Sequence, residues 1–231
     1  MPYRRLPNTD SARIRSLECI LRKEEAAFGP QPVLSFRIVN EVKSFLPRFK
    51  SAHALYHQNM HAQVKDNGKY QTNLRNARMY ISHFIQVLGM CMMRNEIRPA
   101  VAGLYGLSPE RFTVPDLTGE NAVLQWGEKI IKGENLRIQQ RGTPIYNPAI
   151  AKVSVHYEIF REAFNARKNA MANTAKSLQA LAQMREEADK IILEIWNQVE
   201  ARFASLPEAE RLERCREYGV IYYLRKKEKN G

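Results

Sequence analysis

Cysteine is scarce in this chain of 231 residues, and its three cysteines, Cys19, Cys91 and Cys215, are widely separated. There is no C-x-x-C pair, and an odd number of thiols cannot all be paired within one chain. Disulfide frameworks belong to oxidising compartments. We therefore expect a cytoplasmic protein whose fold needs no disulfides.

Long apolar runs are also missing. The longest, VLGMCMM (87–93), is far shorter than the roughly 20 residues that cross a bilayer, so we expect no membrane span. The opening stretch MPYRRLPNTD (1–10) has no apolar segment of the kind found in signal peptides, so we expect no secretory signal.

The signatures of common enzymes are absent as well. The sequence has no G-x-S-x-G, Walker A, G-x-G-x-x-G or H-E-x-x-H pattern. A di-iron bundle uses Glu-x-x-His on two helices, but none of the five histidines has an acidic residue three positions before it. The residues therefore favour a non-enzymatic protein with no catalytic residues and no cofactor.

Acidic residues are too few to balance the basic ones. The 36 Lys and Arg exceed the 24 Asp and Glu by 12, and residues 1–100 alone hold 16 basic against 7 acidic residues. Aromatic and basic residues alternate in YRRL (3–6), FLPRFK (45–50) and YYLRKK (222–227). Such a surface can attract a nucleic acid or another polyanion, although a solvated Arg-rich surface has the same composition.

Apolar residues recur in steps of three and four in three stretches, which predicts helices at 7–30, 35–65 and 70–95. Asn8 or Thr9 can cap the first of them. The expected apolar seam of the second is Val39, Val42, Leu46, Phe49, His53, Tyr56 and Met60, and that of the third is Tyr70, Leu74, Ala77, Ile81, Phe84, Leu88 and Cys91. KDNGK (65–69) predicts a turn between these two helices.

Residues 149–206 contain neither Gly nor Pro, so they could form one helix or two. Shifting the chain by 111 positions places the seam of 39–88 on that of 150–199. Matched pairs include Val42 with Val153, Phe49 with Phe160, Met60 with Met171 and Ile81 with Ile192. We therefore predict a second helical hairpin that turns around 173–179. If 149–206 were instead one rod, half of it would lack cover and a homo-oligomer would be expected.

Two similar hairpins, about 35–96 and about 148–205, predict an all-α fold in which one domain (1–231) forms an up-and-down four-helix bundle. The connector, 97–147, begins as a loop and holds a helix at 118–140, which Gly127 and Gly133 weaken. The final segment, 206–231, contributes a short helix and a strand.

The strand is VIYYLRK (220–226), which is rich in β-forming residues. A lone strand leaves backbone groups unpaired, so it needs a partner. We expect RFTV (111–114) to pair with it in a minor two-stranded β element. The alternative is that the strand adds to the edge of another protein's sheet.

Several stretches together resemble a family of uncharacterised bacterial proteins. They are MPYRRLPNTD (1–10), MYISHFIQVL (79–88), NPAIAKVSVHYEIF (147–160), ILEIWNQVE (192–200) and EYGVIYYLRK (217–226). The resemblance spreads over nearly the whole chain. It implies a helical, cytoplasmic bacterial protein and transfers no site residue.

Three histidines, His53, His57 and His61, are spaced four residues apart on the second predicted helix. They share one side, but the first and last are about 12 Å apart along the axis, so one ion cannot bind all three. No acidic residue lies between Glu41 and Asp66 to complete a ligand set. A core or boundary position explains these histidines better, and metal binding remains a weaker alternative.

The leading hypothesis is a helical-bundle protein that acts by binding an unidentified protein partner. Nucleic-acid binding by the basic N-terminal half is the first alternative, and metal binding at the histidines is the second. The residues predicted to contact a partner are Arg4, Arg5, Arg13 and Arg15 near the start, and Tyr222, Tyr223, Arg225 and Lys226 near the end.

Overall fold

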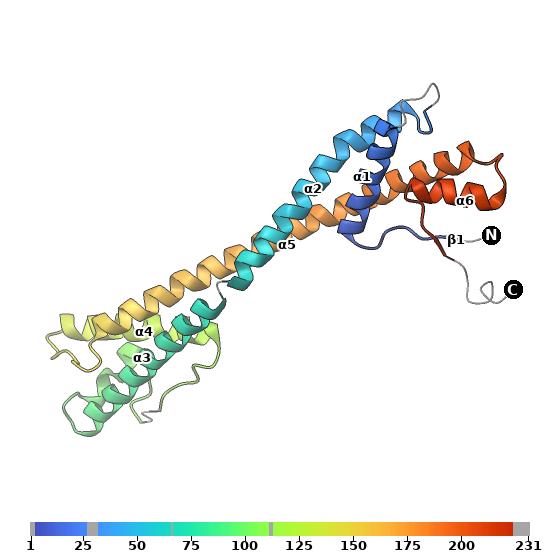
Figure 1. Cartoon of the computed structure of the whole chain (residues 1–231). Coiled ribbons are helices and arrows are strands. Elements are labelled where there is room, and N and C mark those ends of the chain that lie inside the picture. The colour runs from blue at the N-terminus through green and yellow to red at the C-terminus, as the bar shows by residue number, and fades with distance from the viewer. Residues whose placement is uncertain (1–2, 27–31, 66, 111–112, 224–231) are drawn as a thin grey trace, which may run out of the picture. The chain divides into compact units, whose positions relative to one another are not determined.

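The computed structural model describes residues 3–26, 32–65, 67–110 and 113–223, and these residues are all-α apart from a small two-stranded sheet (Figure 1). The all-α part of the predicted fold class and the minor two-stranded β element are thereby confirmed for these residues. The α-helices are α1 (Asp10–Ala26), α2 (Phe36–Lys65), α3 (Asn67–Met93), α4 (Glu120–Gln139), α5 (Ile150–Arg202) and α6 (Glu208–Glu217). The other elements are the 3-10 helix η1 (Pro99–Tyr105) and the strands β1 (Tyr3–Arg4) and β2 (Tyr222–Tyr223).

The chain divides into two compact units. Unit 1 consists of Met1–Met60 and Asn173–Gly231, and unit 2 consists of His61–Ala172. Within the described ranges, every helix is either too short or too polar to span a membrane.

Helix α5 replaces the second predicted hairpin. It runs unbroken from Ile150 to Arg202, so the turn expected around 173–179 is wrong. No Gly or Pro interrupts this part of the sequence, and Asn165 and Asn169 are exposed, where asparagine costs a helix less than about 1 kcal/mol. The match at a shift of 111 positions therefore reflects repeated helical spacing rather than two hairpins.

The first predicted hairpin, about 35–96, is also wrong, because α2 and α3 contribute to different cores. The buried residues of α2 pack in unit 1 with residues 181–199 of α5. Those of α3 pack in unit 2 with α4 and with residues 153–160 of α5. The seam predicted for α3 is confirmed from Tyr70 to Leu88, but it faces other elements than expected. The described part of the chain therefore does not form the predicted four-helix bundle.

In unit 1, α2 lies antiparallel to the C-terminal part of α5. At the start of α2, the Ser35 N–H donates to the Gln198 side chain (2.9 Å), and near its end Asn59 donates to the Ser177 hydroxyl (3.2 Å). The largest fully buried side chains of this core are Leu17 and Ile20 of α1, Ile38, Phe45 and Phe49 of α2, and Trp196 of α5.

The two strands pair near the ends of the chain, with Tyr3 opposite Tyr223 and Arg4 opposite Tyr222. RFTV is therefore not the strand partner: its residues 113–114 are not in a strand, and 111–112 lie outside the described residues. RFTV belongs to unit 2, whereas the N-terminal residues and Tyr222 belong to unit 1. We call β1 and β2, extended by the Arg5 N–H bond to the Ile221 carbonyl (3.2 Å), the terminal ribbon.

In unit 2, α3, α4 and the N-terminal part of α5 surround the second core. The Tyr70 ring of α3 lies 5.9 Å from the ring of Phe160, and Tyr80 stacks on His156 at 4.1 Å, so α3 is antiparallel to α5. The two glycines of α4 allow close packing against neighbouring elements. A Cβ at Gly127 would lie 2.3 Å from the Tyr157 ring, and one at Gly133 would lie 2.7 Å from a backbone carbonyl of η1.

Candidate functional site

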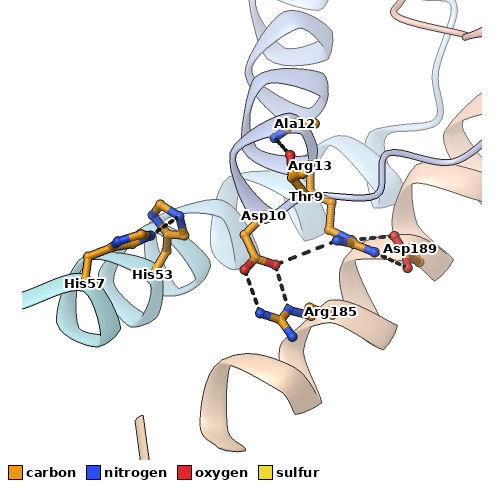
Figure 2. A network of polar contacts seen from close by, with 8 residues as sticks. All are labelled: Thr9, Asp10, Ala12, Arg13, His53, His57, Arg185 and Asp189. Atoms are coloured by element: carbon orange, nitrogen blue, oxygen red, sulfur yellow. Dashed lines mark hydrogen bonds and ion pairs between the residues drawn. The ribbon is translucent and has the colours of Figure 1, made fainter. Parts of the chain in front are cut away.

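A network of ion pairs joins the start of α1 to α5 (Figure 2). Asp10 accepts two hydrogen bonds of 2.8 Å from Arg185, and Arg13 donates to both carboxylate oxygens of Asp189 at 2.7 and 2.8 Å. Hydrogen bonding by Arg185 holds the pKa of Asp10 below its usual value. Thr9 caps α1 by accepting the Ala12 N–H, which is one of the two predicted caps. Arg13, predicted to contact a partner, is buried in this network.

Two of the three histidines of α2, His53 and His57, lie beside the same network (Figure 2). The Nε2 atoms of His53 and His57 are 3.1 Å apart, so one ring donates to the other, and the rings meet edge to face. Among the described residues, no group of three or more His, Cys, Asp or Glu side chains could hold a metal ion.

The inner face of the terminal ribbon is anchored to α5. Arg4 donates to Asn197 (2.8 Å) and pairs with Glu200 (3.3 Å). The Tyr222 hydroxyl donates to the same Glu200 carboxylate at 2.6 Å. Burial, reinforced by this carboxylate, raises the pKa of Tyr222. Two of the residues predicted to bind a partner therefore hold the ribbon in place.

The outer face of the ribbon consists of Tyr3, Arg5, Ile221 and Tyr223, because side chains alternate between the two faces of a strand. All four are exposed, with Tyr3 at 48 % and Tyr223 at 42 %. The two tyrosine rings lie 6.1 Å apart, and the Arg5 guanidinium lies 5.6 Å from the centre of the Tyr223 ring. Adjacent strands thus gather two aromatic rings, a cation and an isoleucine on one surface.

The other predicted partner-binding residues are not part of this face. Arg15 is exposed on α1. Arg225 and Lys226 lie outside the described residues. Of the eight predicted residues, the structure therefore brings Arg5 and Tyr223 together on an exposed surface, with Tyr3 and Ile221 added to them.

Unit 2 contains a buried charge cluster that the sequence did not reveal. Glu134 is fully buried, and its carboxylate accepts hydrogen bonds from the Tyr105 hydroxyl (2.5 Å), from Arg137 (2.8 and 2.9 Å) and from the Ile145 N–H (3.2 Å). Arg137 also donates to the Thr143 carbonyl at 2.7 Å. Burial is the main cause that raises the pKa of Tyr105. These groups satisfy one another, so the cluster fixes the connector and offers a ligand no unused charge.

A groove of about 410 Å³ opens in unit 2. It is lined by the C-terminal end of α2, the first turns of α3 and the facing part of α5. We call it the α3–α5 groove. One wall is formed by Ile159, Ala163, Ala166 and Ala170 of α5, and Ala62 of α2 contributes to the other side. In the sequence this wall is marked by alanines spaced three and four residues apart (163, 166 and 170), a pattern that does not distinguish a groove from any other helix face.

The candidate sites are thus two surfaces, the outer face of the ribbon in unit 1 and the α3–α5 groove in unit 2. No protein-family model, curated protein or solved structure matches the chain. The function is therefore inferred from the residues of these two surfaces.

Proposed function

We propose that this protein acts without catalysis, by binding another macromolecule through the outer face of the terminal ribbon. The observation that carries the proposal is the division of the ribbon into an anchored face and an exposed one. Arg4 and Tyr222 are fixed to α5, whereas Tyr3, Arg5 and Tyr223 point away from it.

The composition of the outer face supports binding to a protein. Tyrosine and arginine are enriched among the residues that contribute most to protein–protein affinity, since each offers a large contact area and a polar group. A surface that is already ordered loses less conformational entropy on binding. Here Glu200 holds Arg4 and Tyr222, so the tyrosines and Arg5 on the opposite face are positioned before a partner arrives.

A nucleic acid is the alternative partner, since aromatic rings next to cations can stack on bases and contact phosphates. The outer face contributes one cation, Arg5, to such a contact. The sequence adds Arg225 and Lys226 just beyond the described part of the ribbon. We include a role in the cytoplasm in the proposal, since the three widely separated cysteines favour a reducing compartment.

Site-specific photocrosslinking in the native host tests the proposal. A benzophenone amino acid replaces Tyr223 in one version of the full chain and Tyr146, which is 78 % exposed in unit 2, in the control. We expect a discrete adduct from position 223 that position 146 does not give. Sensitivity of the adduct to protease identifies a protein partner, and sensitivity to nuclease identifies a nucleic acid.

Two results would count against the proposal. Equal adducts from the two positions would show indiscriminate contact, and the absence of adducts from position 223 would show that the outer face is not a binding surface. A nuclease-sensitive adduct would shift the proposal to nucleic acid, and its formation should then weaken steeply as salt is raised.

A further inference from the structure

We propose that His53 and His57 together chelate one divalent transition-metal ion, with Zn²⁺ as the ion to test first. Both histidines belong to α2 in unit 1, and neither is part of the terminal ribbon. The inference therefore does not depend on the proposed function. It adds the binding of a metal ion to the proposed binding of a macromolecule.

The distance between the two imidazole nitrogens matches that of a chelate. The Nε2 atoms of His53 and His57 are 3.1 Å apart. Metal–nitrogen bonds of about 2.0–2.1 Å place two nitrogens on one ion about 2.9 Å apart in a square arrangement and about 3.3 Å apart in a tetrahedral one. The observed separation lies between these two values, so small rotations of the rings are enough to bind an ion.

The orientation of the rings also suits a chelate. Residues four apart on a helix lie on the same side, about one turn from each other, and α2 is continuous from Phe36 to Lys65. The ring centres are 4.4 Å apart, farther than the two nitrogens, and the ring planes are inclined by 62°. The nitrogen-bearing edges therefore approach each other. Both histidines are half-buried, so part of their conformational entropy is already lost before an ion binds.

A hydrogen bond and a chelated ion bring the same two nitrogens together, and they differ in where the protons lie. In the hydrogen bond, one Nε2 carries a proton and the other accepts it. In the chelate, both Nε2 lone pairs bind the ion, and the proton of each neutral ring lies on Nδ1. Moving a proton from Nε2 to Nδ1 leaves the ring neutral, so binding requires no change in the charge of either histidine.

The ion pairs beside the histidines do not oppose a cation. Arg185 is paired with Asp10 at 2.8 Å and Arg13 with Asp189 at 2.7 Å, so the charges of this network balance (Figure 2). Asp10 is the carboxylate of the network that interacts electrostatically with His53. A metal ion at the histidines would therefore have a carboxylate, as well as two neutralised arginines, in its neighbourhood.

The donor atoms determine which ions fit. Imidazole nitrogen suits Zn²⁺, Ni²⁺ and Cu²⁺, whereas Mg²⁺ and Ca²⁺ prefer oxygen. Among the described residues, no third His, Cys, Asp or Glu joins the pair, so the other coordination positions are open to water. We therefore expect a reversible site, weaker than a structural zinc site with four protein ligands.

The test is isothermal titration calorimetry of the full chain, without an affinity tag, with Zn²⁺ and with Mg²⁺. We expect saturable binding of one Zn²⁺ per chain and no binding of Mg²⁺, since the donors are nitrogens. The absence of saturable Zn²⁺ binding would overturn the proposal.

Histidine variants locate the ion. We expect His53→Ala and His57→Ala each to weaken Zn²⁺ binding at least about tenfold, because each removes one of two ligands. The matched controls are His61→Ala and His83→Ala, which remove exposed histidines of α2 and α3 and should change the affinity by less than about twofold. Alanine is the best helix former, so the helices should persist, and His57→Gln checks the loss with a side chain of similar polarity.

The remaining outcomes either support the pair or exclude it. Unchanged affinity in His53→Ala and His57→Ala would mean that Zn²⁺ binds elsewhere, and a loss in His61→Ala equal to that in His53→Ala would assign the ion to another pair. With Cu²⁺ as the probe, electron paramagnetic resonance should detect two nitrogen ligands in the original chain and one in His57→Ala. Crosslinking at position 223 should be unchanged in His57→Ala, so failure of the metal site and failure of the ribbon can be told apart.

Discussion

Each unit of the chain contains a carboxylate bound by an arginine, and the two pairs differ in their contact with water. In unit 1, the side chains of Asp10 and Arg185 are 14 % and 35 % exposed. In unit 2, those of Glu134 and Arg137 are 0 % and 6 % exposed. Both pairs have N–O distances of 2.8 Å, so geometry does not distinguish them.

Burial changes what such a pair contributes. Two charges removed from water lose hydration, and their attraction offsets that loss only when hydrogen bonds satisfy the remaining atoms. Tyr105 and the Ile145 N–H supply those bonds to Glu134. A partly exposed pair loses less hydration and is weakened by solvent screening. Removal of one partner of the pair should therefore lower the free energy of unfolding far more in unit 2 than in unit 1.

Arg137→Leu should have the largest effect. It leaves the Glu134 carboxylate buried without its cation, which costs about 3–5 kcal/mol of the free energy of unfolding. Urea denaturation followed by circular dichroism measures the loss.

The double variant Glu134→Leu with Arg137→Leu is the control for this prediction. It removes both charges and should be more stable than Arg137→Leu alone, because no buried charge is left unpaired. The alternative is that the cost comes from lost packing rather than from an unpaired buried charge. In that case the double variant loses as much free energy of unfolding as Glu134→Leu and Arg137→Leu lose together.

Tyr105→Phe should follow, with a loss of about 1–3 kcal/mol, because it removes a hydroxyl that donates to Glu134 and accepts from Arg137 (2.9 Å) inside the core. Burial raises the pKa of Tyr105 above the usual 10.0, so the folded state keeps this proton where the unfolded state loses it. The stabilisation that the hydroxyl gives to the folded state is fully present below pH 10.0 and is lost as the pH rises from there through the higher pKa of the folded state. The stability difference between the original chain and Tyr105→Phe should therefore narrow in alkali, and a constant difference would contradict this.

Asp10→Asn should cost only about 1 kcal/mol, since solvent reaches the Arg185 side of the pair. The pKa of Asp10 is lowered from 3.8, chiefly by hydrogen bonding from Arg185. Its contribution is therefore present above pH 3.8 and is lost as the pH falls through the lower pKa of the folded state. Denaturation curves of the two proteins should converge below that pH. If the original chain remains more stable than Asp10→Asn in acid, Asp10 stabilises the protein through packing or hydrogen bonding rather than through its charge.

Helix spacing predicted the parts of the fold that depend on local sequence. The α3 seam from Tyr70 to Leu88 and the short helix expected within 206–231, which is α6, are confirmed, since both follow from residues within a few turns. The continuity of α5 could not be predicted, because the same spacing suits one helix or two. The strand Tyr3–Arg4 is too short to show a strand pattern, so the partner of β2 was missed.

The candidate sites depend even more on tertiary contacts. Arg5 and Tyr223 stood out in the sequence, but their separation from the anchored Arg4 and Tyr222 requires the pairing register of the ribbon. Glu134 and Arg137, three residues apart, have the spacing of an ordinary exposed pair on a helix. Their burial comes from Tyr105 and the packing of η1 on α4, which no local pattern shows.

Lys23→Ala should have the smallest effect. It tests whether the exposure of an ion pair determines how much that pair stabilises the protein. Lys23 pairs with Glu217 at 3.2 Å, and both side chains are 41 % exposed. Solvent screening and side-chain entropy offset most of such an attraction, so the free energy of unfolding should change by less than about 0.5 kcal/mol. Lys23→Gln, which keeps most of the side chain's length, controls for lost packing. A loss from Lys23→Ala as large as that from Asp10→Asn would mean that burial does not set the order of these pairs.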